Sequence, residues 1–301
     1  MHSRSIQPVP AVRTEPASGF RDELQFFGPP GSQMLGCRHV PLASSHAGLV
    51  LCSSLRAEFE TNYRREILLG RSLASTGITV QRFQYLGTGN SDGATEAVTL
   101  ESMTADTIAA TRWLEAGRRL DRVAFMGTRL GASVAASVAS SKKTAPLVLW
   151  EPVLDPKKYF RELFRSRQMW AAKESAIGDP TESAARQIHR APVDVLGYPI
   201  DLGLYESVQR MSLEDALGST PRPVLIVQIG GRELRGEYRA LSDRLTQSGF
   251  DVRVERVEEN ESWWLEPPGE RQEKRVLKTS PAIDATREWL AESFSSKEEH
   301  P

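Results

Sequence analysis

The chain has 301 residues and a formal net charge of −1. That length is enough to bury a full hydrophobic core, and the near-neutral charge gives no electrostatic reason to expect nucleic acid as a partner. The two cysteines, Cys37 and Cys52, have neither CxxC nor metal-ligand spacing, which argues against a disulfide framework and favours a reducing, cytoplasmic setting. The N-terminus lacks the apolar core of a signal peptide, and no run approaches the ~18 apolar residues of a membrane span.

The predicted elements alternate between strands and helices. Residues 1–22 are polar, contain proline and are predicted to form a flexible tail. The stretches 24–28 and 34–42, separated by the turn sequence PPGSQ, predict a leading hairpin. Further strands are predicted at 47–54, 78–87, 122–127, 146–153, 221–231 and 250–257, and helices at 62–77, 100–117, 130–141, 238–249 and 280–294. This pattern predicts an α/β fold with a mostly parallel central sheet covered by helices on both faces, and the hairpin adds antiparallel strands at its edge.

Residues 155–220 interrupt this alternation, because they show helical patterning and little strand signal. Phe160, Leu163, Phe164 and Arg167 follow one another at i, i+3, i+4 and i+7. Such spacing predicts a helix that packs on the body of the protein through its apolar side, including Tyr159. A helix lying on a membrane surface is the alternative. We therefore expect a helical cap insertion at 155–220 within a core formed by 23–154 and 221–296.

One turn has the glycine spacing of a catalytic motif but not its nucleophile. Gly127-Thr128-Arg129-Leu130-Gly131 stands between a predicted strand and a helix of small residues. In the nucleophile elbow, the central position of this turn carries the residue that attacks a carbonyl. Arginine stays protonated and cannot act in that way.

This order of strand, GTRLG turn and helix resembles the α/β-hydrolases. The stretch RFQYLGTGNSDG resembles the loop after the fourth strand of serine-aminopeptidase-like hydrolases. More narrowly, four stretches resemble the hydrolases associated with exosortase systems: FFGPPGSQMLGCRHVP, NYRREILLGRSLASTGITVQRFQYLGTGNSDG, WEPVLDPKKYFRELFR and DVLGYPIDLGL. The resemblance extends over roughly residues 24–293. The resemblance implies an α/β-hydrolase fold and suggests genomic company with polysaccharide export or other envelope assembly.

A Ser-His-acid mechanism needs a nucleophile, a histidine and a carboxylate, and two of these positions lack the required residue. Arg129 holds the nucleophile position, and the neighbouring Thr128 does not project into the cleft as the central residue does. No histidine follows the last predicted strand; the chain's histidines are His2, His39, His46, His189 and His300. Glu233 is well placed by chain order to be the acid, but it has no histidine to orient. The degenerate triad argues against ordinary serine hydrolysis.

Arg129 has two predicted roles. The elbow tip lies at a helix N-terminus, where unpaired N–H groups and the helix dipole favour an anion, and a guanidinium adds a fork that fits a carboxylate or a phosphate. Alternatively, Arg129 pairs internally with Glu151, which directly follows a strand, or with Glu233. Both roles remain open from the sequence.

Other side chains are expected to meet at the same edge of the sheet. The predicted substrate-binding residues are Ser53, Ser54, Leu55, Asn90, Ser91, Thr128, Leu130, Trp263 and Trp264. Cys52 is either a small buried residue or a reactive thiol. The stretch GTGNSDG lacks the GxGxxG spacing of dinucleotide-binding loops, and no cluster has metal-ligand spacing, so we expect no cofactor and no metal.

Three functions are compatible with these residues. The first is a non-classical enzyme in which Arg129 orients an anionic or acyl-type substrate while Glu151 or Glu233 acts as acid or base. The second is a non-catalytic binding protein or partner subunit. The third is an esterase or peptidase with a displaced nucleophile, such as Cys52 or Thr128 with His189. The expected partner is a small-molecule, acyl or peptide ligand with an anionic group, and the sequence indicates no oligomeric state.

Overall fold

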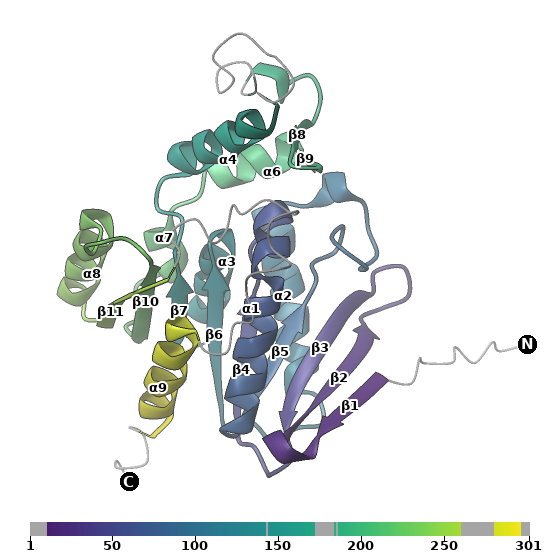
Figure 1. The fold of residues 1–301 in the computed structure, drawn as a ribbon, viewed down its shortest axis with the longest axis vertical. Coiled ribbons are helices and arrows are strands. Elements are labelled where there is room, and N and C mark those ends of the chain that lie inside the picture. The colour runs from purple at the N-terminus through teal and green to yellow at the C-terminus, as the bar shows by residue number, and fades with distance from the viewer. Residues whose placement is uncertain (1–10, 143, 172–183, 185, 260–279, 296–301) are drawn as a thin grey trace, which may run out of the picture.

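The computed structural model describes residues 11–142, 144–171, 184, 186–259 and 280–295 (Figure 1). A nine-stranded sheet runs through it in the order β1-β2-β3-β5-β4-β6-β7-β10-β11. Its strands are β1 (Ala11–Glu15), β2 (Phe20–Phe27), β3 (Met34–Pro41), β4 (Ala47–Cys52), β5 (Ile78–Phe83), β6 (Arg122–Thr128), β7 (Leu147–Trp150), β10 (Pro223–Ile229) and β11 (Asp251–Val257). The core helices are α1 (Arg56–Ser75), α2 (Leu100–Glu115), α3 (Leu130–Ser140), α8 (Gly236–Gln247) and α9 (Pro281–Ser295), and two 3-10 turns are η1 (Pro16–Ser18) and η2 (Thr95–Ala97).

The sheet confirms the predicted mixture of strand directions. The strands from β5 to β11 in the sheet order pair in parallel, whereas β1, β2 and β3 pair antiparallel with one another and β3 with β5. The predicted flexible tail at 1–22 is wrong for residues 11–22, because β1 pairs with β2 along its whole length. Residues 1–10 lie outside the described part of the chain. Alternation in β1 was hard to recognise because all of its side chains but one are exposed.

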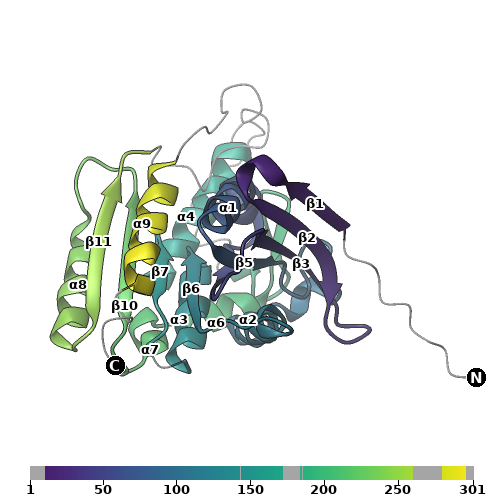
Figure 2. The same cartoon turned by 90° about the horizontal axis from the view of Figure 1, so that it is seen from below.

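The parallel strands are buried on both faces, as their continuous apolar sequences require. Successive residues point to opposite faces of a strand. In β4, Leu49 and Leu51 pack with the cluster formed by α1 and α9, whereas Val50 and Cys52 pack with the cluster formed by α2, α3 and α8. Figure 2 shows α1 and α9 on one side of the central strands and α2 and α3 on the other. The predicted three-layer arrangement is therefore confirmed.

A cap stands over the carboxyl ends of the parallel strands (Figure 1). It contains α4 (Pro156–Ala171), β8 (Val193–Val195), β9 (Tyr198–Ile200) and α6 (Leu202–Gln209), and α7 (Leu213–Leu217) leads back to the core and packs against α3. The predicted helix is present, and its Tyr159, Phe160, Leu163 and Phe164 are buried as expected. Because that apolar side is covered, it is not a membrane-facing surface. The β8–β9 hairpin was not predicted, since strands of three residues leave almost no periodic signal.

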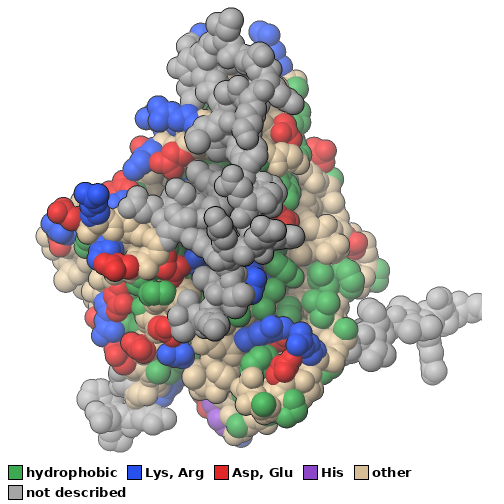
Figure 3. Space-filling view, viewed as in Figure 1, with side chains coloured by type: hydrophobic (Ala, Val, Ile, Leu, Met, Phe, Trp, Pro, Cys, Tyr) green, Lys and Arg blue, Asp and Glu red, His purple; other side chains and the backbone are tan. Residues whose placement is uncertain are grey.

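The exposed apolar side chains gather on the antiparallel side of the molecule. Figure 3 shows hydrophobic side chains clustered there, and the exposed ones on β1 and β2 include Val12, Leu24 and Phe26. At the sheet edge, Arg13 pairs with Glu15 at 2.5 Å. Charged side chains on an edge strand disfavour pairing with another strand. Within the described residues, no helix combines the length and the hydrophobicity that crossing a membrane requires.

A buried histidine cluster joins this antiparallel part to α1. His39 Nδ1 lies 2.5 Å from Asp22 Oδ1, and Asp22 Oδ2 accepts hydrogen bonds from Arg71. Cys37 of β3 and Arg82 of β5 face the same imidazole, and His39 packs against Gly70. Burial lowers the pKa of His39, although its hydrogen bond to Asp22 opposes that effect. Burial alone would raise the pKa of Asp22, but the bonds from His39 and Arg71 outweigh it, so that pKa is lowered.

The depressed pKa of His39 predicts a pH-dependent stability. Below the unfolded pKa of about 6.5, the unfolded chain binds a proton at this position that the folded chain does not. The wild type is therefore expected to lose up to about 1.4 kcal/mol of unfolding free energy per pH unit, relative to His39→Gln, as the pH falls from about 6.5. Urea unfolding of both proteins between about pH 5 and 8 measures this difference. Parallel pH curves for the two proteins would contradict it.

Candidate functional site

The turn between β6 and α3 is folded as a nucleophile elbow. Arg129 has φ 56° and ψ −120°, a strained conformation for a residue with a side chain. The flanking glycines are required by close packing: a Cβ at Gly127 would lie 2.1 Å from the Gly131 carbonyl oxygen, and one at Gly131 would lie 2.2 Å from that of Cys52. The chain therefore keeps the geometry of the catalytic turn and places an arginine at its tip.

Gly131→Ala is expected to destabilise the protein, because its methyl group meets backbone atoms that cannot rotate away. Forcing an extra carbon into packed surroundings costs about 1–3 kcal/mol. Gly236→Ala is the matched control, since a Cβ at Gly236, the first residue of α8, meets no atom within 4 Å. Chemical denaturation of the two variants compares the costs, and an equal effect of both would show that the elbow tolerates a side chain.

Arg129 is held by Glu58, which is not among the predicted site residues. Its Nε donates to Glu58 Oε1 of α1 at 2.9 Å, and its Nη1 donates to the Glu151 carbonyl oxygen at 3.4 Å. Only 6% of Arg129 is exposed, and its guanidinium lies 5.5 Å from the centre of the Tyr159 ring. The internal ion pair is present, but the predicted partner carboxylates, Glu151 and Glu233, were wrong.

The charge of Glu58 is stabilised from several directions. Tyr159 of the cap donates its hydroxyl to Glu58 Oε2 at 3.1 Å. Burial raises the pKa of Glu58, and the charge and hydrogen bonds of Arg129 and Tyr159 partly offset this. Burial also acts against the charge of Arg129, but Glu58 outweighs it and the pKa of Arg129 is raised. Arg129 is thus a fixed cation, joined by Glu58 to α1 and, through Tyr159, to the cap.

A sequence signal for this arrangement exists in α1. Glu58, Asn62 and Glu66 stand at i, i+4 and i+8, and all three are almost fully buried. Residues at this spacing lie on one face of a helix. A polar stripe on the face of a helix that covers a sheet points to buried polar contacts near the strand ends. The helix predicted at 62–77 begins after Glu58, so the prediction did not include the whole of this polar face.

Glu151 forms a second buried ion pair beside the elbow. Its Oε2 lies 2.5 Å from Arg235 Nη1 and accepts from the Tyr238 hydroxyl at 2.9 Å, while Oε1 accepts from the Ile229 N–H at 2.7 Å and from Arg235 Nη2 at 3.2 Å. Its own backbone is in the left-handed region, with φ 46°. Glu233 lies in the following loop with an exposed side chain. The catalytic role assigned to these glutamates stays a prediction, and the contacts of Glu151 are those of a structural anchor.

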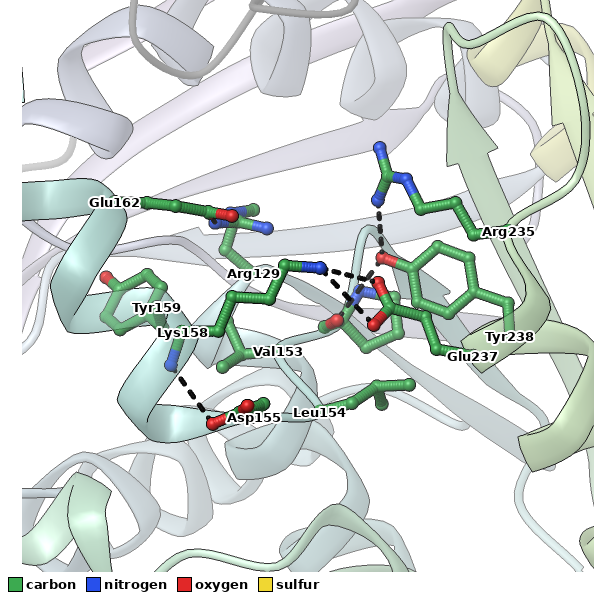
Figure 4. Close-up of a pocket in the computed structure, with 11 residues that line it drawn as sticks. Arg129, Val153, Leu154, Asp155, Lys158, Tyr159, Glu162, Arg235, Glu237 and Tyr238 are labelled. Carbon is green, nitrogen blue, oxygen red and sulfur yellow. Dashed lines mark hydrogen bonds and ion pairs between the residues drawn. The ribbon is translucent and has the colours of Figure 1, made fainter.

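A cavity opens beside the elbow; we call it the Arg129 cavity (Figure 4). Its volume is about 280 Å³, and it is lined by Arg129, Pro152, Val153, Leu154, Asp155, Lys158, Tyr159, Glu162, Arg235, Glu237 and Tyr238. Lys158 reaches toward Glu237 at 3.3 Å, and Glu162 lies over the Arg129 guanidinium with a 3.7 Å contact. Three cationic and three anionic side chains therefore share the wall, and their charges balance.

A second cavity, the Ser53 cavity, has a volume of about 400 Å³. It lies between the ends of β4 and β5 and the cap hairpin, and it is lined by Ser53, Ser54, Leu55, Phe59, Glu60, Phe83, Gln84, Tyr85, Gly87, Thr88, Gly89, Asn90, Thr95, Tyr198 and Pro199. The predicted residues Ser53, Ser54, Leu55 and Asn90 are brought together here. The aromatic wall was not predicted, because its residues come from α1, β5 and the cap.

The remaining predicted residues lie elsewhere. Ser91 stabilises the loop after β5, since its hydroxyl donates to the Gln84 carbonyl oxygen at 2.7 Å and accepts the Leu35 N–H at 3.0 Å. Thr128 and Leu130 are buried, and neither lines the two cavities. Trp263 and Trp264 lie outside the described residues.

The structure does not support a displaced nucleophile at the predicted positions. Cys52 is fully buried, and burial raises its thiol pKa to about 12, so it is not a reactive thiol. Thr128 is also fully buried, whereas His189 is exposed in the cap beside Tyr205. No described group of three His, Cys, Asp or Glu side chains is arranged to hold a metal ion.

The fold has many relatives among solved structures. The ferulic acid complex of Est1E from Butyrivibrio proteoclasticus is 14% identical at a TM-score of 0.65, over 90% of this chain and 99% of that chain. An esterase from Pyrococcus furiosus is 14% identical at a TM-score of 0.60, over 97% of this chain and 100% of that chain. A thioesterase domain from the curacin biosynthetic pathway is 13% identical at a TM-score of 0.54, over 90% and 99%.

Sequence comparison adds no closer assignment. No family model matches the chain, and no curated protein matches it in sequence. The narrower resemblance to exosortase-system hydrolases stays a prediction. The sheet order, the elbow at the end of β6 and the solved relatives agree on one architecture. The chain is a protein of the α/β-hydrolase fold.

Proposed function

We propose that this protein binds a small, uncharged, carbonyl-containing ligand in the Ser53 cavity and forms no covalent acyl intermediate at its elbow. The observation that carries the proposal is the nucleophile position itself, which is occupied by a buried arginine paired with Glu58. A cation cannot attack a carbonyl. No histidine stands between His189 and His300 in the sequence to take a proton from any other nucleophile.

The lining of the Ser53 cavity supports an uncharged ligand. Phe59, Phe83, Tyr85 and Tyr198 supply aromatic surface, and the polar groups are hydroxyls and carboxamides. Glu60, an exposed side chain, is the charged residue among those lining this cavity. Apolar walls with a few placed polar groups are typical of small-molecule sites. The similar structure of Est1E contains ferulic acid, an observation that favours an aromatic ligand here as well.

A non-covalent enzyme is less well supported than a binding protein. Such an enzyme needs an acid or base next to its substrate. Glu151 and Glu233, the residues predicted for that role, line neither cavity. An anionic ligand in the Arg129 cavity is a second candidate, favoured by the presence of Arg129, Lys158 and Arg235 in its wall. The three acidic side chains beside them weaken the attraction for an anion.

The proposal is tested by titrating the protein with cinnamamide, an uncharged aromatic amide, in a calorimeter. Asn90→Trp places an indole at the mouth of the Ser53 cavity from an exposed position, and Glu96→Trp adds the same group at an exposed site that does not line it. We expect saturable binding by wild type and Glu96→Trp and at least about tenfold weaker binding by Asn90→Trp, a loss of 1.4 kcal/mol. Equal affinity of all three proteins, or no saturable binding, would contradict the proposed site.

A further inference from the structure

Glu66 is a buried carboxyl group next to the Ser53 cavity. It lies on α1 and is fully buried. The Ser53 hydroxyl donates to Glu66 Oε2 at 2.7 Å, and the nearest cation, Arg82, is 3.9 Å from the same oxygen. Oε1 accepts no hydrogen bond from any described residue. A buried carboxylate oxygen without a donor is costly, so these surroundings favour the protonated acid.

Ser53 connects this carboxyl group to the cavity. The Ser53 hydroxyl faces Glu66, and Ser53 also lines the Ser53 cavity. The Ser53 carbonyl oxygen accepts a hydrogen bond from the Tyr85 hydroxyl at 3.4 Å. The packing against the elbow is close, because a Cβ at Gly131 would lie 2.6 Å from that carbonyl oxygen. Ser53 is therefore fixed between Glu66 and any ligand in the cavity.

We propose that ligand binding in the Ser53 cavity is coupled to the uptake of a proton by Glu66, through the hydroxyl of Ser53. This inference rests on the proposed function. A hydroxyl has one proton to donate and lone pairs that accept. When Ser53 donates to a ligand carbonyl oxygen, it no longer donates to Glu66. The contact between them is then kept only if Glu66 is protonated and donates to the Ser53 oxygen.

Among the described side chains around Glu66, Glu66 itself is the one that titrates near neutral pH. Burial raises the pKa of Glu66 to about 7, although Arg82 and Ser53 oppose this. Burial also raises the pKa of Cys52 at the end of β4 to about 12 and that of Tyr85, after β5, well above its usual value. Both stay neutral. A proton taken up on binding has Glu66 as its acceptor.

The coupling defines the ligand class and the direction of the pH effect. A ligand must offer a hydrogen-bond acceptor, such as an ester, ketone or amide oxygen, to take the Ser53 proton. Binding raises the pKa of Glu66 further, so affinity is greatest where Glu66 is already protonated. We expect about tenfold weaker binding at about pH 8 than at about pH 6, because above the free pKa each pH unit costs one power of ten.

Calorimetry with cinnamamide in two buffers of different ionisation enthalpy tests this inference. At about pH 7.5, wild type is expected to take up more than about half a proton per ligand, since Glu66 is then mostly ionised. Glu66→Gln keeps an N–H donor for Ser53 without a titrating group, so its binding should be independent of pH and take up no proton. Glu96→Gln, an exposed change outside the cavity, should behave like wild type.

The outcomes separate the two proposals. Cinnamamide binding that is blocked by Asn90→Trp but takes up no proton would leave the binding site standing and overturn the coupling. Equal proton uptake by wild type and Glu66→Gln would also overturn it, because another group would be the acceptor. Absence of cinnamamide binding would overturn both the binding function and the coupling.

Discussion

Glu58→Ala is expected to lower the free energy of unfolding by about 3–5 kcal/mol, because it removes the carboxylate that is hydrogen-bonded to the buried Arg129 cation. Arg129 Nε loses its acceptor at 2.9 Å, and the Tyr159 hydroxyl loses its acceptor at 3.1 Å. The arginine cannot relieve this cost by losing its proton. Urea denaturation followed by circular dichroism measures the change.

Two further variants show whether the loss comes from the ion pair. Glu60→Ala removes an exposed glutamate from the same helix and is expected to change stability by no more than about 0.5 kcal/mol. The double variant Glu58→Leu/Arg129→Met replaces the pair with apolar side chains and should recover most of the loss, since apolar replacements of buried pairs are often neutral or stabilising. If Glu58→Ala lowered the unfolding free energy by less than about 1 kcal/mol, this would contradict a buried Arg129 cation that is stabilised by Glu58.

Glu151→Ala is expected to have an effect of similar size, about 3–5 kcal/mol, for a related reason. The change removes the acceptor of the buried Ile229 N–H and one acceptor of the Tyr238 hydroxyl, and it removes the carboxylate that pairs with the half-buried Arg235. The left-handed backbone of residue 151 remains strained in the variant. Thermal unfolding measures the loss.

Glu233→Ala is the matched control for Glu151→Ala, because Glu233 follows the next strand and its side chain is exposed. It is expected to leave stability unchanged within about 0.5 kcal/mol. Equal effects of the two changes would contradict the structural role given to Glu151. A small effect of Glu151→Ala with a large loss of cinnamamide binding would instead support the catalytic or binding role predicted from sequence.

The fold was largely predictable because its signals are local. The buried strands are continuous apolar runs, and the glycines at 127 and 131 mark a turn whose packing leaves no room for a side chain. The sequence also predicts that four residues lie close together, because the loops that follow parallel strands lie at one edge of the sheet. These residues are Ser53, Ser54, Leu55 and Asn90. These inferences need only the order of elements along the chain.

The partners of the charged residues could not be predicted in the same way. Glu58 is 71 residues from Arg129 in sequence, and their contact depends on how α1 is rotated against the sheet. Chain order does not decide whether Glu151 pairs with Arg129 or with Arg235. In the structure, the Glu151 carboxylate pairs with Arg235, whereas Arg129 donates to the Glu151 carbonyl oxygen. The polar residues of α1 indicate its buried face, but they do not predict which residue of the core pairs with Glu58.

Exposing wild type and Arg129→Ser to a fluorophosphonate and measuring intact mass shows most directly whether the elbow reacts covalently. We predict no adduct on either protein, because Arg129 blocks attack in the wild type and the sequence has no histidine between His189 and His300 to activate the serine of the variant. No adduct on the wild type agrees with an elbow occupied by the buried Arg129–Glu58 pair, and no adduct on Arg129→Ser shows that a serine at the tip is not enough to make the elbow reactive. An adduct on the wild type, mapped to any serine, threonine or cysteine, would contradict a cleft that binds its ligand without covalent chemistry.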